Sequence, residues 1–190
     1  MARYFIALLP PDDIQAEVCG IKQYFSDHYH SRKAFNSPPH ITLQPPFEWS
    51  QSVPEDEKDA ENFTPTELVD GLNEFAASQA PVSIQLSGFA AFAPRVIYIN
   101  VLKTSALATL QTEVIRYFAS RWGIIDRAAK GRAFVPHMTV AFRDLTKQNF
   151  WAGWAEFKDR SFEAQFKVTV LTLLRHTGQR WEVHQNFPLG

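Results

Sequence analysis

Two histidines of this chain are each followed, two residues later, by a threonine, within the same short motif. The motif reads Pro-His-apolar-Thr-apolar and occupies residues 39–43 (the first motif) and 136–140 (the second motif). Its polar side chains are those of His40, Thr42, His137 and Thr139. Because side chains alternate between the two faces of a β-strand, the histidine and threonine of each copy would point the same way. Two facing strands would therefore bring two imidazoles and two hydroxyls into one cleft.

A cleft of this kind can cleave a phosphodiester without a metal ion. Imidazole titrates near neutral pH, so one histidine can take a proton from water while the other gives a proton to the leaving alkoxide. Threonine hydroxyls can donate hydrogen bonds to the non-bridging phosphate oxygens, where negative charge builds up in the transition state. The predicted chemistry suits a strained cyclic phosphate in particular.

Other chemistries fit the sequence less well. Two histidines without a carboxylate or thiol at a matching spacing leave a zinc ion short of ligands, so we expect no metal and no other cofactor. The sequence has no Gly-x-Ser-x-Gly elbow of a serine hydrolase and no glycine-rich loop that would hold phosphates.

Length and composition favour one ordinary domain. The chain has 190 residues, of which 45% are hydrophobic, enough for a substantial core. Its formal net charge of -1 argues against a large non-specific nucleic-acid binder, so any such role would concern an end or a nucleotide. A single cysteine, Cys19, excludes an internal disulfide and fits the cytoplasm. No apolar run approaches the ~20 residues of a membrane helix, and no heptad pattern indicates assembly, so we expect no membrane contact and a monomer.

The apolar pattern predicts the elements that position the motifs. A strand over residues 4–9 and an apolar helical stripe up to residue 25 precede the first motif, whose strand is expected to end at Pro45. A strand over residues 96–102 and a helix capped by Thr104 or Ser105 precede the second motif. This repeat predicts a single bilobal domain over the whole chain, with two similar lobes and one motif in each.

The remaining segments are expected to complete these lobes. Thr66 would cap a short helix ahead of a strand over residues 82–86. Aromatic residues between positions 150 and 157 have helical spacing and are expected to pack in the core. Residues 167–174 and 179–187 would form a closing hairpin, whereas the acidic segment over residues 50–63 is interpreted as a solvated loop.

At the paired motifs the chain resembles the 2H phosphoesterase superfamily, and within it the family of 2′-5′ RNA ligases and RNA 2′,3′-cyclic phosphodiesterases. The likeness extends to a central hairpin over residues 89–101, an Arg-x-Phe-x-Pro-His run over residues 132–137 and the ending over residues 186–189. It implies a bilobal α+β fold in which two antiparallel sheets face a central cleft and helices cover their outer faces. It also implies hydrolysis of 2′,3′-cyclic phosphates to 2′-phosphates, with 2′-5′ joining of RNA ends in some members.

The resemblance further implies roles for the motif residues. His40 would protonate the departing 3′-oxygen and His137 would activate water, although a near-symmetric site could run with these roles exchanged. Thr42 and Thr139 would hold the phosphate.

Two places depart from the family pattern. Residues 44–47 read Gln-Pro-Pro-Phe, where many members have a Phe-Leu-Gly type sequence. Many members also have an arginine five residues after the second histidine, where this chain has Phe142. Arg143 follows, and strand alternation would place it on the face of His137, within reach of the phosphate.

Four residues outside the motifs are candidate substrate contacts: Arg132, Arg143, Tyr98 and Phe47. Arg132 would bind an anion or remain a solvated loop residue. Tyr98 would hydrogen-bond the substrate or pack within its strand, and Phe47 would stack on a base or pack in the core. The other four histidines, at positions 28, 30, 176 and 184, are not expected to act in catalysis.

Three functions are compatible with these residues. The first is metal-independent hydrolysis of the 2′,3′-cyclic phosphate of an RNA end or nucleotide to a 2′-phosphate, by acid–base catalysis with the paired histidines. The alternatives are 2′-5′ joining of RNA ends and non-catalytic binding of a phosphorylated RNA end. The sequence leaves open whether the substrate is an RNA 3′-end, a mononucleotide or an ADP-ribose cyclic phosphate.

Overall fold

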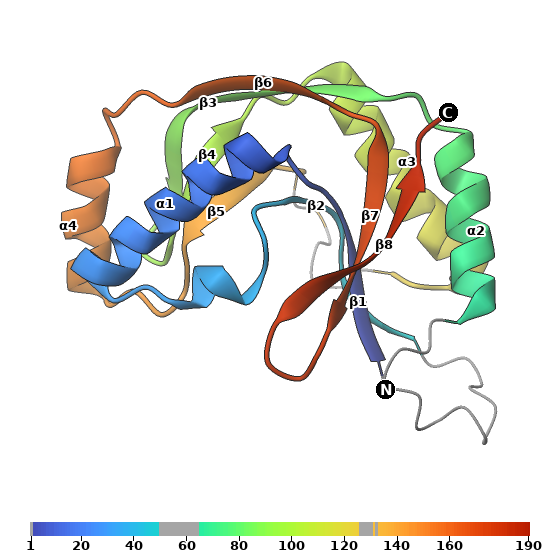
Figure 1. The fold of residues 1–190 in the computed structure, drawn as a ribbon, viewed down its shortest axis with the longest axis horizontal. Coiled ribbons are helices and arrows are strands. Elements are labelled where there is room, and N and C mark those ends of the chain that lie inside the picture. The colour runs from blue at the N-terminus through green and yellow to red at the C-terminus, as the bar shows by residue number, and fades with distance from the viewer. Residues whose placement is uncertain (1, 50–64, 126–130, 132) are drawn as a thin grey trace.

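The computed structural model describes residues 2–49, 65–125, 131 and 133–190, which form two antiparallel four-stranded sheets (Figure 1). The strand orders are β2-β1-β7-β8 and β5-β4-β3-β6. The strands are β1 Ala2–Leu8, β2 Ile41–Trp49, β3 Val82–Phe92, β4 Val96–Val101, β5 His137–Ala141, β6 Glu163–Val168, β7 Val170–His176 and β8 Trp181–Pro188. The helices are α1 Asp12–Tyr29, α2 Thr66–Ala77, α3 Ser105–Trp122, α4 Lys147–Phe157 and the short 3-10 helix η1 Lys33–Asn36. The α+β class with two antiparallel sheets is confirmed.

The two motif strands occupy equivalent places. β2 is an edge strand paired with β1, and β5 is an edge strand paired with β4, both in antiparallel fashion. The order strand, helix, motif strand therefore occurs as β1-α1-β2 and again as β4-α3-β5. The division of the chain into two pseudo-symmetric lobes stays a prediction.

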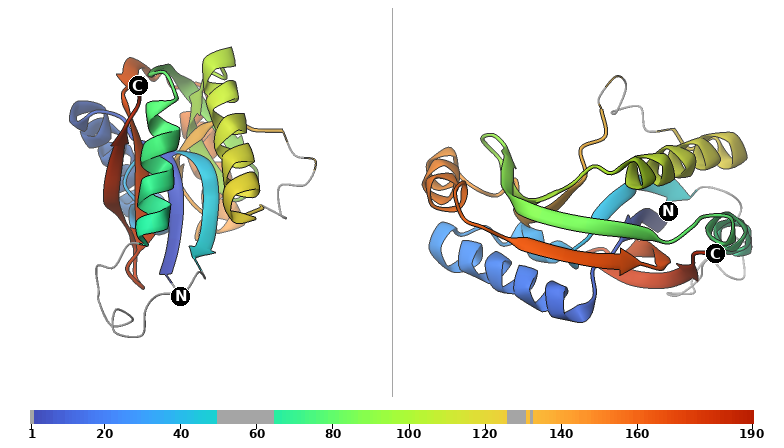
Figure 2. Two further views of the ribbon diagram at one scale, coloured as in Figure 1. Left: turned by 90° about the vertical axis from the view of Figure 1, so that its right-hand side faces the viewer. Right: turned by 90° about the horizontal axis from the view of Figure 1, so that it is seen from above.

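Two of the helices, α1 and α3, link the two sheets. α1, which precedes the first motif, packs against β5 of the second motif, and α3 packs against β2 of the first. In Figures 1 and 2, α1 and α4 lie together at one end of the molecule, while α2 and α3 lie at the other. Separating the two motif strands would therefore expose apolar helix faces to water.

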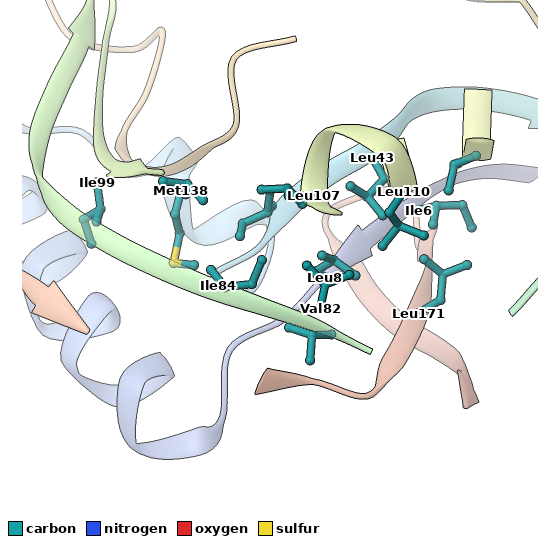
Figure 3. Close-up of a cluster of buried hydrophobic side chains, with 14 of the residues drawn as sticks. Ile6, Leu8, Leu43, Val82, Ile84, Ile99, Leu107, Leu110, Met138 and Leu171 are labelled. Atoms are coloured by element: carbon teal, nitrogen blue, oxygen red, sulfur yellow. The ribbon is translucent and has the colours of Figure 1, made fainter. Parts of the chain in front are cut away.

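The apolar residues of both motifs lie in one core, which Figure 3 shows in part. Ile41, Met138 and Val140 are fully buried, and Leu43 is 1% exposed. The threonines and histidines beside them are half-buried, as strand alternation predicts. Burial of the four apolar side chains fixes the register that turns their polar neighbours the other way.

Two helix starts and one aromatic stripe test the expectations for the helices. The Thr104 side chain caps α3 by accepting a hydrogen bond from the backbone N–H of Leu107, which confirms that prediction. The Thr66 prediction is wrong, because α2 begins at Thr66 itself and Pro65 occupies the cap position. In α4, Phe150 and Phe157 are buried, but Trp151 lies on the outer face and is 49% exposed.

Two strand boundaries differ from the sequence-based expectation. β2 does not stop at Pro45 but continues through Pro46 to Trp49. Its register shifts between the pairs Tyr4–Phe47 and Ile6–Gln44, so two prolines lie opposite one residue of β1. A bulged edge strand tolerates proline because its ladder does not need those N–H groups.

The segment expected as one strand over residues 167–174 is in fact two strands in different sheets. β6 ends at Val168 and pairs with β3, whereas β7 begins at Val170 and pairs with β1 and β8. Only Thr169 lies between them, and its carbonyl oxygen accepts a hydrogen bond from Leu189 at 2.9 Å. The apolar pattern across this junction is continuous, so it carries no signal that the chain changes sheets.

Candidate active site

The two motif strands line one cavity of about 280 Å³. All four polar motif residues contribute to its wall: His40, Thr42, His137 and Thr139. The 33–37 segment, which contains η1, forms another side with Lys33, Ala34, Asn36 and Ser37. Phe5, Phe142, Trp181 and Pro46 supply apolar surface. The structure thus brings together the residues that the sequence separates by about half its length.

The histidines of both motifs make the same kind of hydrogen bond to a backbone carbonyl oxygen. His40 Nδ1 lies 2.7 Å from the carbonyl oxygen of Pro38, and His137 Nδ1 lies 2.8 Å from that of Val135. A carbonyl oxygen only accepts hydrogen bonds, so Nδ1 carries the proton in each ring. In the neutral imidazoles, Nε2 is then the nitrogen left to accept a proton. The two rings are therefore prepared in the same tautomer.

The surroundings disfavour protonation of both imidazoles. The pKa of His40 is lowered to about 4, mainly by burial, with smaller lowering effects of the Lys22 charge and of His137 and an opposing, raising effect of the hydrogen bond to Pro38. Burial also lowers the pKa of His137, opposed by its bond to Val135. At neutral pH both rings are thus predominantly neutral in the unliganded protein.

Aromatic rings support each imidazole from its own sheet. The centre of the Phe5 ring lies 4.9 Å from that of the His40 ring. On another side, the Phe5 ring contacts Trp181, with ring centres 4.8 Å apart. Tyr98 and Phe92 lie 5.2 and 5.1 Å from the ring of His137. Together with the backbone hydrogen bonds, these ring contacts hold each imidazole in one orientation.

The structure places the candidate substrate contacts outside the motifs in different surroundings. Arg132 lies outside the described residues. Tyr98 is 6% exposed and packs on His137 and Phe92 without lining the cavity. Phe47 is 7% exposed and packs against Tyr4 and Phe118, so the structure places it in the core.

The expected position of Arg143 is wrong. β5 ends at Ala141, so strand alternation does not extend to Arg143, which lies in a turn. Its side chain is exposed, and its guanidinium lies 5.4 Å from the centre of the Phe142 ring. Phe142, and not Arg143, lines the cavity.

Two lysines near the site were not found from the sequence. Lys33 lines the cavity, and Lys22 is only 1% exposed on α1. The Lys22 ammonium donates hydrogen bonds to the carbonyl oxygens of Ala34 at 2.9 Å and Ser37 at 3.0 Å. Burial lowers the pKa of Lys22 to about 8. A lysine in an amphipathic helix or a polar loop carries no sequence signal for such a position.

The donor set suits an anion better than a metal ion. In the described part of the chain, no three His, Cys, Asp or Glu side chains gather closely enough to hold a metal ion. The residues of the described cavity wall include no Asp or Glu but comprise two histidines, three residues with a hydroxyl group, one asparagine and one lysine. Among the described residues, no helix is both long and apolar enough to cross a bilayer.

Comparison with known proteins agrees with this arrangement. A protein of Bacillus cytotoxicus named "putative phosphoesterase" is 29% identical over 189 residues, covering 97% of this chain and 95% of that protein. The crystal structure of TT0787 from Thermus thermophilus has a TM-score of 0.64 at 19% identity, covering 98% of this chain and 97% of that one. That of Escherichia coli LigT complexed with 3′-AMP has a TM-score of 0.63 at 18% identity, covering 99% and 98%. The family model described as the 2′-5′ RNA ligase superfamily matches residues 10–180, and the chain belongs to that superfamily.

Proposed function

We propose that the protein hydrolyses the 2′,3′-cyclic phosphate of an RNA end or nucleotide to a 2′-phosphate by general acid–base catalysis, without a metal ion. The observation that carries the proposal is the matched pair of histidines in one cavity. Each imidazole is fixed through Nδ1 by the carbonyl oxygen two residues before it, which leaves both Nε2 atoms for proton transfer.

The threonines would bind the phosphate between the two rings. Thr42 and Thr139 line the same cavity as the histidines and are half-buried. Their hydroxyls can donate hydrogen bonds to the non-bridging oxygens as negative charge develops there. In a partly desolvated cavity such bonds stabilise the transition state more than they would in water.

The electrostatics favour one distribution of the proton-transfer roles. The Lys22 ammonium acts on His40 and disfavours its protonated form, which suits a base more than an acid. In our proposal His40 Nε2 takes the proton of the attacking water as its oxygen bonds to phosphorus. His137 reacts in its protonated form, which the negative charge of the bound phosphate stabilises. As the bond from phosphorus to the 3′-oxygen breaks, Nε2–H of the His137 imidazolium donates its proton to that oxygen and leaves the ring neutral with Nδ1 protonated. This exchanges the roles that the family resemblance implies.

The apolar part of the cavity supports a nucleotide substrate. Phe5, Phe142 and Trp181 line it beside the polar residues, and Trp181 is half-buried with part of its ring accessible. Aromatic faces stack on nucleobases with little dependence on base identity. The LigT structure contains 3′-AMP, a nucleotide with its phosphate on the ribose, which is consistent with a nucleotide substrate for this chain.

A substrate screen in the presence of EDTA tests the proposal. We expect turnover of 2′,3′-cyclic nucleotides or of RNA with a 2′,3′-cyclic phosphate end, with the 2′-phosphate as the product. His40→Ala and His137→Ala should each lower kcat by ~10²–10⁴-fold. Full activity in both variants would refute the paired-histidine mechanism. Tight nucleotide binding without turnover would instead identify a binding protein, and a 2′-5′ linked product from nicked RNA would identify a ligase.

A further inference from the structure

One residue with a positively charged side chain belongs to the described wall of the cavity, and it lies in neither motif. This side chain is Lys33, on η1, and the described wall contains no arginine or carboxylate. Lys33 is exposed and forms no ion pair with another described residue. Because both imidazoles are held predominantly neutral, Lys33 supplies the fixed positive charge of this wall at neutral pH.

The backbone of Lys33 is fixed by a carboxylate from the other half of the chain. Asp144 Oδ2 accepts hydrogen bonds from the backbone N–H of Arg32 at 2.6 Å and of Lys33 at 2.9 Å. The hydroxyl of Ser31, which is fully buried, donates to Asp144 Oδ1 at 3.0 Å. The same hydroxyl accepts the backbone N–H of Phe142 at 3.0 Å. Ser31 and Asp144 thereby join two residues of the cavity wall, Lys33 and Phe142.

The 33–37 segment is also held from its buried side. The ammonium of Lys22 donates hydrogen bonds to the carbonyl oxygens of Ala34 and Ser37, which belong to the cavity wall. The segment is therefore fixed through its N–H groups at one end and its carbonyl groups further along. A wall held in this way presents the Lys33 side chain from a defined backbone position and lowers the entropy lost when an anion binds.

We propose that Lys33 binds the phosphate of the substrate and stabilises its negative charge during cleavage, and that Ser31 and Asp144 position it. The inference rests on the proposed function and adds the cation that the two histidines and two threonines do not provide. Attack of water adds negative charge to the non-bridging oxygens of a phosphodiester that is already an anion. An ammonium beside those oxygens stabilises the transition state more than the ground state. Lys33 acts through its charge alone and forms and breaks no covalent bond.

A comparison of two neighbouring cations tests the role of Lys33. Lys33→Ala should lower kcat/KM for a 2′,3′-cyclic nucleotide by about 10- to 100-fold. Lys33→Arg, which keeps the charge, should recover most of that loss. Arg32→Ala is the matched control, because it removes the adjacent cation, whose side chain does not line the cavity. Equal losses in Lys33→Ala and Arg32→Ala, or a loss of less than twofold in Lys33→Ala, would overturn the inference.

A double-mutant cycle tests the positioning role of Ser31. If Ser31 acts through Lys33, Ser31→Ala should lower kcat/KM several-fold in the wild-type background but leave it unchanged in Lys33→Ala. Thermal unfolding of each variant checks that the comparison is made on folded protein. Independent, additive losses would show that Ser31 does not act through Lys33 and would overturn this part of the inference.

Ligand binding separates this inference from the proposed reaction. Titration calorimetry with a nucleoside 2′-monophosphate needs no turnover and applies to the full chain as it is. If no cyclic phosphate is hydrolysed but the nucleotide binds at least tenfold more weakly to Lys33→Ala, the reaction is refuted and the cation site stands. If the wild-type protein and Lys33→Ala bind the nucleotide equally, the cation site is refuted whatever the outcome of the activity screen.

Discussion

The buried ammonium of Lys22 donates a hydrogen bond to the carbonyl oxygen of Ser37 at 3.0 Å, three residues before His40. This hydrogen bond places a positive charge on the buried side of the 33–37 segment, which precedes the first motif. The same charge acts on the imidazole of His40 and adds to the effect of burial. The first histidine thus differs from the second in its electrostatic surroundings, although both rings make the same backbone hydrogen bond.

Lys22→Met should raise the pKa of His40. The substitution keeps most of the side-chain volume but removes the charge, while burial, the larger cause of the lowered pKa, remains. The pKa is therefore expected to rise from about 4 without reaching the ordinary value of 6.5. NMR titration of the imidazole resonances measures the change, with His137 as the internal reference. An unchanged pKa of His40 would refute the electrostatic role of Lys22.

The lowered pKa of His40 should make folding stability depend on pH. The unfolded chain binds a proton at His40 near pH 6.5 and the folded chain only near pH 4, so stability is fully present above pH 6.5 and declines as the pH falls to 4. At about 1.4 kcal/mol per pH unit, one such group accounts for a loss of about 3 kcal/mol. Denaturant unfolding at pH 7 and pH 4 measures this loss in the free energy of unfolding. Between these pH values, His40→Gln should lose about 3 kcal/mol less than the wild type. Parallel pH curves for the two proteins would argue against it.

A substrate with sulfur in place of the 3′-bridging oxygen should distinguish the acid from the base. A thiolate leaves without protonation, so loss of the general acid matters little for this substrate. If His137 is the acid, His137→Ala should cleave the sulfur substrate ~10²-fold or more faster than the oxygen substrate. His40→Ala should remain slow with both substrates. Rescue of His40→Ala alone would reverse the assignment.

Removing one threonine hydroxyl should slow catalysis without unfolding the protein. Thr42→Val and Thr139→Val keep the shape of the side chain in its strand but remove the donor to phosphate. We expect each to lower kcat by ~10²-fold, by analogy with loss of a single oxyanion donor. Thr112→Val, on the exposed face of α3, is the matched control and should leave kcat unchanged. Wild-type rates in both motif variants would show that the hydroxyls do not contact the reacting phosphate.

Phe47 should contribute to stability and not to substrate binding. Its ring packs between those of Tyr4 and Phe118 and is 7% exposed. Phe47→Ala should therefore lower the free energy of unfolding by about 3–5 kcal/mol. At a temperature where the variant is folded, its KM for a cyclic nucleotide should match that of the wild type. A large rise in KM with little loss of stability would instead support a base-stacking role.

The motif geometry was predictable because it depends on a local rule. Strand alternation alone places His40 and Thr42 on one side and Ile41 on the other, and the buried core enforces this arrangement. The repeated order of elements then indicates that the two motifs hold equivalent positions. The polar centre of the site could therefore be predicted before the sheets were known.

The rest of the wall depends on contacts that no local pattern encodes. Lys33 reaches the cavity because Asp144, more than a hundred positions later, fixes its backbone. Arg143 fails to reach the cavity because β5 ends two residues earlier, a boundary set by the turn and not by hydrophobicity. The burial of Lys22 could not be predicted from its helix, because burial of a charged side chain depends on tertiary contacts. Sequence periodicity predicts which face of an element is buried but not what approaches the other face.

The single residue between β6 and β7 separates two strands that complete different sheets, which bears on when the cavity can form during synthesis of the chain. β6 completes one sheet, whereas β7 and β8 complete the other, so the first sheet needs the chain up to residue 168 and the second needs it up to residue 188. When residue 168 has left the ribosome, both motif histidines have emerged, but β7, the second neighbour of β1, has not. A nascent chain halted before Thr169 would carry both motifs but lack β7, β8 and the Trp181 part of the cavity wall, so we expect the complete cavity to form late in translation.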